Sequence, residues 1–347
     1  MRVNRSRWIN LGFQVLAVVL ALLFTTLVLI LSGAPPLAAY TNIIAGAFGS
    51  FKQFSDVLVA WVPLMLVTSG LLVTFAAGLW NIGIEGQITL GAIFTTGVLR
   101  MLQDSTLPPW IILLLSILAG MLGGALWAAL AGALKTYGGV NEIFGGLGLN
   151  FVAVALTLWL IFGPWKRPGI GSMSGTEPFP GSLWLSQITG TRLSIWSIIL
   201  AIAGIVIVYF LLQGTYFGLR LKAVGKNIQA AYIIGIPTSR YMMSAFLICG
   251  AFAGLAGTIQ VIGVYHRLIP SISSGYGYLG LLVAMLVNYS ALATIPIALF
   301  FASLNIGSIQ LPIVLKLDSS LSGVLQGALV LFVLMMNGVR QRVMNRR

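Results

Sequence analysis

Long apolar runs separated by short polar breaks dominate the pattern of this chain. The first, residues 11–31, has 21 residues, and at about 1.5 Å per residue such a helix crosses the roughly 30 Å hydrocarbon layer of a membrane. The later runs are Val57–Gly78, Trp80–Leu99, Trp110–Leu134, Ile143–Phe162, Leu193–Leu212, Tyr241–Tyr265, Gly277–Asn288, Ala291–Leu311 and Leu321–Asn337. The pattern predicts an all-α polytopic membrane protein with about ten transmembrane helices.

The first run looks like a secretory signal, because three arginines precede it within Met1–Asn10. A signal core is only about 7–15 residues long, so we expect this run to be retained as the first helix. Residues Gly33–Asp56 then form an outer loop, where Pro35 and Pro36 oppose a helix.

Composition supports a membrane protein and excludes a soluble one. The 347 residues are 59% hydrophobic and only 7% charged, and we treat 1–347 as one transmembrane domain. The net charge of +13 does not indicate a nucleic-acid partner, because the basic residues lie at span ends. The inner segments of a ten-span topology hold 12 of the 19 basic residues. This bias places both termini in the cytoplasm.

The span Trp80–Leu99 is the least apolar, since Asn81, Glu85 and Gln87 lie near its start. Broken helices that point their ends at a substrate are common in transporters, so we predict a short or broken span here. The alternative places Glu85 in the cytoplasmic headgroup layer. With Asn150 and Gln260, these side chains are the candidate lining of a translocation path for an uncharged polar solute.

Small residues recur at four-residue spacing in two other spans. They predict strips where helix backbones approach closely, formed by Gly120 and Gly124 in one span and, in another, by Gly250 with Gly254 and Ala253 with Gly257. The longest outer loop, Gly163–Arg192, is rich in proline and glycine and is expected to be irregular, with Trp165 and Trp184 at the membrane interface.

The longest basic break, residues 214–240, contains four basic residues and no acid. Helical spacing of its apolar positions predicts one or two short helices lying across the membrane face, with a bend at Gly225. Ala230 and Ala231 offer a small surface that fits a groove on another protein. The alternative is a basic loop that only sets orientation.

Motifs for catalysis are not found. Gly225-Lys226 lacks the remainder of a phosphate loop, and the glycines of residues 275–280 follow no strand, so they more simply let a helix start close to a neighbour or ligand. His266 is the single histidine and Cys249 the single cysteine, too few for a conventional metal site or disulfide. We expect no enzyme activity, no metal and no cofactor.

Residues 215–236 resemble the cytoplasmic coupling loop of bacterial ABC importer permeases, in the branch for simple sugars, nucleosides and branched-chain amino acids. The run Asn81-Ile-Gly-Ile-Glu-Gly-Gln87 is similar to a signature of the nucleoside-type permeases. The resemblance implies that the loop contacts an ATPase through Gly218, Arg220, Lys222, Ala223, Gly225, Asn227, Ala230, Ala231 and Gly235. Lys222 stands where the family commonly has arginine, which keeps the charge but not the planar fork.

The same resemblance implies cytoplasmic ABC ATPase subunits, a second and related permease chain, and an extracytoplasmic solute-binding protein at the bacterial inner membrane. Nucleosides are the expected solute, with simple sugars as the alternative. An ion-coupled secondary transporter is the other class, although Glu85 is the only acid within a predicted span.

Overall fold

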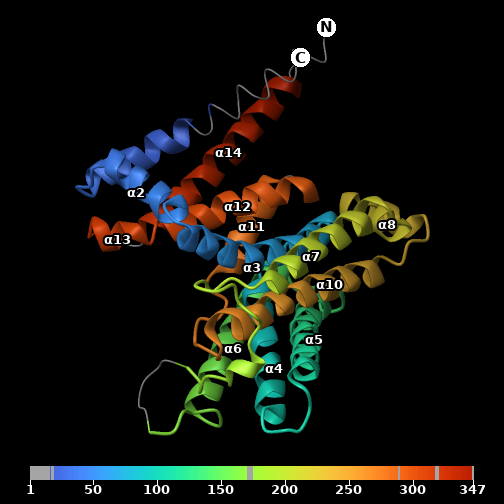
Figure 1. The fold of residues 1–347 in the computed structure, drawn as a ribbon. Helices are drawn as coiled ribbons and strands as arrows, with labels where there is room; N and C mark the ends of the chain where they lie inside the picture. The colour runs from blue at the N-terminus through green and yellow to red at the C-terminus, as the bar shows by residue number, and fades with distance from the viewer. Residues whose placement is uncertain (1–15, 17–18, 170–174, 288–289, 317–319, 346–347) are drawn as a thin grey trace. The chain divides into compact units, whose positions relative to one another are not determined.

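The computed structural model describes residues 16, 19–169, 175–287, 290–316 and 320–345. Throughout these ranges the regular elements are helices, with one isolated β-bridge between Gln187 and Ser194. After a first helical stretch at Val19–Leu31, the elements are α2 (Pro36–Phe48), α3 (Phe51–Ala76), α4 (Ile84–Leu102), α5 (Pro109–Thr136), α6 (Glu142–Phe162), η1 (Gly181–Leu183), α7 (Ile195–Gln213), α8 (Tyr216–Lys226), α9 (Ile228–Ile233), α10 (Thr238–Ile259), η2 (Gln260–Tyr265), α11 (Tyr276–Leu286), α12 (Ala291–Gly307), α13 (Gln310–Val314) and α14 (Leu321–Asn345). The predicted all-α class is therefore confirmed (Figure 1).

Within the described residues, six helical segments are long and apolar enough to cross a membrane. They are Phe51–Ala76, Pro109–Thr136, Glu142–Phe162, Ile195–Gln213, Thr238–Tyr265 and Ala291–Val314. A bent pair raises the number to seven if it is one span. The bent pair is Val19–Leu31 with Pro36–Phe48, at 111°. The run Trp80–Leu99, for which the sequence predicts a short or broken span, is helical only from Ile84 and is not among the six candidate spans of the described residues.

The predicted outer loop Gly33–Asp56 is wrong, because α2 fills most of it and α3 begins at Phe51. Pro36 is the first residue of α2, where proline is tolerated, since the first N–H groups of a helix have no partner within the helix. The turn before it uses Gly33 at φ +74°. The basic residues of Met1–Asn10 lie outside the described residues.

The chain forms two compact units. One joins residues 1–57 to 299–347, and the other comprises residues 58–298. In the first unit α2 contacts α13, and Leu29, Ile43 and Leu311 are buried in a small shared core. Gly46 lies against the backbone of Gly307, which lets α2 approach the end of α12 closely.

The second unit is built on α4, α5 and α10, which pack against one another. Glycine brings their backbones together. Gly254 of α10 lies against the backbone of Gly120 and Gly124 on α5, and against Gly91 on α4. Gly250 meets Ala125 and Ala128 of α5, while Gly257 meets Ile88 and Ala92 of α4. A Cβ at Gly91, Gly124, Gly250, Gly254 or Gly257 would collide with a neighbouring main chain, and one at Gly120 would collide with the hydroxyl groups of Thr95 and Thr258.

Helix α10 continues into the π-helix η2 and ends at His266, which has a left-handed φ of 56°. The segment before α7 is tied to this end by backbone hydrogen bonds, from Phe179 to His266 and from Leu185 to Ile262. Trp184 stacks on the His266 ring at 3.7 Å between centroids, and burial lowers the pKa of His266 below its ordinary value. The segment Gly163–Arg192 is predicted to be irregular. Residues 175–192 are nevertheless held against the end of η2 by these hydrogen bonds and this stacking contact.

Candidate functional site

Two features of the second unit concern function, and the first is the helix pair α8 and α9. The predicted short helices are present, but the bend lies at Asn227 and not at Gly225, which is inside α8. Asn227 has an extended backbone, and its Oδ1 accepts the Ala230 N–H at 3.0 Å. Thr215 caps α8 in the same way, accepting the Gly218 N–H at 3.0 Å. A side-chain cap explains the bend better than glycine does.

The backbone of α8 is seated directly on two longer helices. Gly218 lies against Leu211 and Leu212 at the end of α7, and Gly225 lies against the chain between Ala76 and Gly78 at the end of α3. Lys222 Nζ donates to the Leu212 carbonyl at 2.6 Å. In Figure 1, α8 lies beside the ends of α7 and α10. Helix α8 is therefore in direct contact with the ends of α3 and α7.

Both helices turn apolar side chains outward. Tyr232 and Ile233 are 72% and 82% exposed, and Leu219 and Ile234 are exposed as well. Ala230 is exposed, but Ala231 is buried within its own chain, so the prediction that both alanines form a free surface is wrong for Ala231. Arg220 reaches the Tyr241 hydroxyl at 3.4 Å, Ala223 is half-buried, and Gly235 ends the pair at φ +84°.

The second feature is a buried polar cluster at the start of α4. Asn81 and Gln87 exchange two side-chain hydrogen bonds, of 3.0 and 2.9 Å, and Asn81 also donates to Cys249 Sγ at 3.1 Å. Asn150 of α6 accepts the Gly86 N–H and donates to the Ile82 carbonyl. The hydrogen bonds of these three amides therefore pair them with one another and with backbone groups in the non-helical connection between α3 and α4.

Glu85 is the acid of this cluster and only 7% of it is exposed. Its Oε1 accepts the backbone N–H of Tyr278 in the first turn of α11 at 3.1 Å, and Gly277 lies directly against its side chain. An oxygen acceptor suits this position, because the first N–H groups of a helix have no partner within the helix. Gln260, at the start of η2, lies within hydrogen-bonding reach of Tyr276. The cluster thus joins α4, α11 and the π-helical end of α10.

Comparison with known proteins fixes the family. Residues 53–334 match the family described as branched-chain amino acid transport system / permease component. The chain belongs to this permease family. It is therefore a multi-pass membrane protein and a permease component of an ABC transporter, and not a catalytic subunit.

The permease is similar to curated relatives along most of its length. It is 31% identical to the glucose ABC transporter permease protein TsgB13 of Haloferax volcanii, over 94% of this chain and 88% of that protein. It is 28% identical to the guanosine ABC transporter permease protein NupP of Bacillus subtilis, over 94% of each. The guanosine permease protein NupQ of the same organism is 29% identical, over 74% of this chain and 82% of that one.

The structure of this permease brings together residues that the sequence did not connect. Tyr278 donates its backbone N–H to Glu85, although the two residues lie 193 positions apart in the chain. The glycines of residues 275–280 were the available signal, since they predicted a helix that starts close to a neighbour, and Gly277 meets Glu85. Nothing in the sequence pattern identified the neighbour.

Proposed function

We propose that this permease forms the membrane passage of a bacterial ABC importer, driven by ATP that separate cytoplasmic subunits hydrolyse. In this proposal the chain crosses the inner membrane about ten times with both termini in the cytoplasm. The candidate spans, the bent pair and the helices α4, α11 and α14 make up that number. A solute-binding protein delivers solute from the outside.

The observation that carries the proposal is the seating of α8 and α9. An ATPase outside the membrane can act on the passage only by favouring one arrangement of the spans over another. A helix pair that exposes Tyr232 and Ile233 and rests its own backbone on α3 and α7 fits that task. A loop that merely set orientation would need neither caps nor backbone contacts.

We assign the solute path to the side of the unit where Glu85 meets α11. Its carboxylate and the nearby Gln260 and Tyr276 supply acceptors and donors suited to the hydroxyl groups of a neutral solute. Asn81, Gln87 and Asn150 belong to the same region, but their hydrogen bonds stabilise the non-helical connection between α3 and α4. Their part in the path is to position Glu85.

Nucleosides are the proposed solute, with simple sugars as the alternative. The run Asn81–Gln87 resembles the signature of nucleoside-type permeases, and two similar relatives are named for guanosine while one is named for glucose. Both classes carry hydroxyl groups, so the polar cluster accommodates either. The pairing of NupP and NupQ in one organism also favours a second, distinct permease chain as partner.

The test is purification of the permease with its associated chains, followed by ATPase assays in proteoliposomes containing the solute-binding protein. We expect a copurifying ATPase whose activity rises with nucleosides and not with glucose. Stimulation by glucose alone would assign the sugar alternative. Uptake in ATP-free vesicles energised by an ion gradient, with no copurifying ATPase, would overturn the importer proposal.

A further inference from the structure

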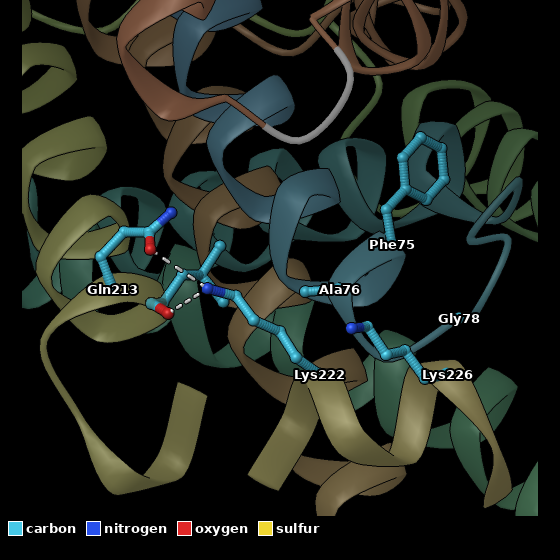
Figure 2. Close-up of a pocket in the computed structure, with 8 residues that line it drawn as sticks. Phe75, Ala76, Gly78, Gln213, Lys222 and Lys226 are labelled. Carbon is cyan, nitrogen blue, oxygen red and sulfur yellow. Dashed lines mark hydrogen bonds between the residues drawn. The ribbon is translucent and has the colours of Figure 1, made fainter. Parts of the chain in front are cut away.

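A cavity of about 310 Å³ lies beneath α8, at the end of α3. Its apolar wall includes Phe75 and Ala76 of α3 and Leu212 of α7. Its other side carries the two lysines of α8, Lys222 and Lys226. Figure 2 shows the Lys222 side chain extending from α8 toward Gln213, and the Lys226 side chain extending toward Ala76 at the end of α3.

The charged side chains that line the cavity are both basic and both come from α8. Lys222 Nζ donates to the Leu212 carbonyl and, at 3.3 Å, to Gln213 Oε1, so one of its three N–H donors remains. Lys226 is exposed. The residues lining the cavity in the described structure include no carboxylate. Two ammonium groups therefore face an apolar wall without a counter-charge on that wall.

The cavity lies where two candidate spans end. Phe75 and Ala76 are the last residues of Phe51–Ala76, and Leu212 is the penultimate residue of Ile195–Gln213. The ends of membrane-spanning helices lie at the level of the lipid headgroups. A ligand in this cavity would thus have its charged part at the depth of lipid phosphate and its apolar part facing the hydrocarbon layer.

We propose that this cavity binds one anionic phospholipid. The phosphate lies between Lys222 and Lys226, and the first carbons of the acyl chains lie along Phe75 and Leu212. Basic pockets between spanning helices are typical sites for anionic headgroups. A free phosphate would pair with the lysines but leave the apolar wall without a contact, and a zwitterionic lipid would bring a third cation toward the two lysines. The site needs only the membrane setting, so it stands independently of the proposed solute and of the ATPase partner.

The bound lipid would fill the space between α8 and the spans on which it rests. Gly225 already touches the chain between Ala76 and Gly78, so the lipid occupies the gap beside that contact. It would stiffen the attachment of α8 to α3 and α7. We therefore expect anionic lipid to strengthen the coupling of α8 to the spans.

The experiment measures lipid retained by the purified full-length permease in detergent, with dansyl-labelled phosphatidylglycerol as the probe and native mass spectrometry as a second readout. Each lysine near a lipid surface contributes about 1 kcal/mol, so Lys226→Gln should weaken probe binding about fivefold. Lys222→Gln plus Lys226→Gln should weaken it further. Arg220→Gln removes the same charge from the same helix outside the cavity and should leave binding unchanged.

Lys226→Gln keeps the test decisive if the double variant fails to fold, because Lys226 is exposed and makes no ion pair among the described residues. Competition separates the sources: unlabelled phosphatidylglycerol should displace the probe, while phosphatidylcholine and inorganic phosphate should not. Displacement by inorganic phosphate would overturn the lipid assignment. Equal losses in Arg220→Gln and Lys226→Gln, or no loss in Lys226→Gln, would overturn the site.

Discussion

At the scale of single residues, the packing of the second unit depends on glycines, which have no side chain to separate the helices. Gly254 touches main-chain atoms of two other helices, so its place cannot be filled by even one methyl group without moving a backbone. Interiors packed this closely respond to added volume with strain and not with local adjustment. At Glu85, by contrast, the side chain itself makes the contact, because its Oε1 accepts a backbone N–H in the first turn of α11.

Gly254→Ala should destabilise the protein by roughly 1–3 kcal/mol, since its Cβ would meet the Gly120 carbonyl. The measurement is the temperature at which the detergent-solubilised permease loses its monodisperse peak. Gly148→Ala is the matched control, because a Cβ at Gly148 of α6 meets nothing within 4 Å, and alanine favours a helix by about 0.5–1 kcal/mol. A Gly254→Ala protein as stable as this control would refute the packing described for α10.

Glu85→Gln should reduce transport while leaving membrane insertion and assembly intact. The amide keeps the shape and an acceptor for Tyr278, but it puts an NH2 donor in place of a carboxyl oxygen beside the first turn of α11, whose own free groups are N–H donors. Uptake in proteoliposomes and copurification are the two readouts. Glu177→Gln, at an exposed position outside the cluster, is the control. Normal uptake by Glu85→Gln would support the headgroup alternative.

At the scale of elements, the pair α8 and α9 exists because each helix begins with its own cap. Short helices of 11 and 6 residues are not stable alone. Thr215 and Asn227 satisfy their first N–H groups, and burial of Leu221, Val224 and Ala231 fixes them to the unit. Substituting Ala231 with a large residue would therefore test folding and not partner binding.

Asn227→Ala should loosen α9 by about 0.5–2 kcal/mol, because the Ala230 N–H loses its acceptor. Amide hydrogen exchange across residues 228–236 should accelerate, and the yield of copurified ATPase should fall. Gln229→Ala changes an exposed position two residues later and should alter neither. Unchanged exchange in Asn227→Ala would show that burial of Ala231 alone holds α9.

The sequence predicts an element well when its structure follows from the local pattern, and poorly when it depends on contacts between residues far apart in the chain. Of the ten spans that the apolar runs predict, six appear as long candidate spans among the described residues, and both short helices are present, since these follow from local pattern. The apolar pattern missed α2, because Pro36 was interpreted as a break when it is a first helical residue. The contact of Glu85 with Tyr278 was also not predictable, since it joins positions 193 residues apart in the chain.

At the scale of the whole molecule, the proposal requires a defined orientation in the membrane. The segment after residue 174 precedes α7 and the helix pair α8 and α9 follows it, so the two lie at opposite ends of one 19-residue candidate span. If the positive-inside rule governs this chain, Arg220 and Arg240 face the cytoplasm and Glu177 faces outward.

Gln229→Cys and Glu177→Cys should therefore react with a membrane-impermeant maleimide from opposite sides. The label should reach Glu177→Cys in intact cells and Gln229→Cys only in inside-out vesicles, since both positions are exposed. The parent chain is a natural blank, because its single cysteine, Cys249, is buried. Labelling of Gln229→Cys in intact cells would reverse the proposed orientation.

The self-capped state of α8 and α9 has a consequence for the kinetics of assembly. Ordering a residue's backbone costs about 1–2 kcal/mol of conformational entropy, and here that ordering has occurred before any partner arrives. In the proposed importer, docking of the ATPase onto the pair would therefore be a rigid-body encounter, whose rate is set by diffusion and orientation and not by folding. A free peptide of residues 214–240 lacks the support of α3 and α7 and would have to fold as it binds, so it would compete poorly with the intact permease.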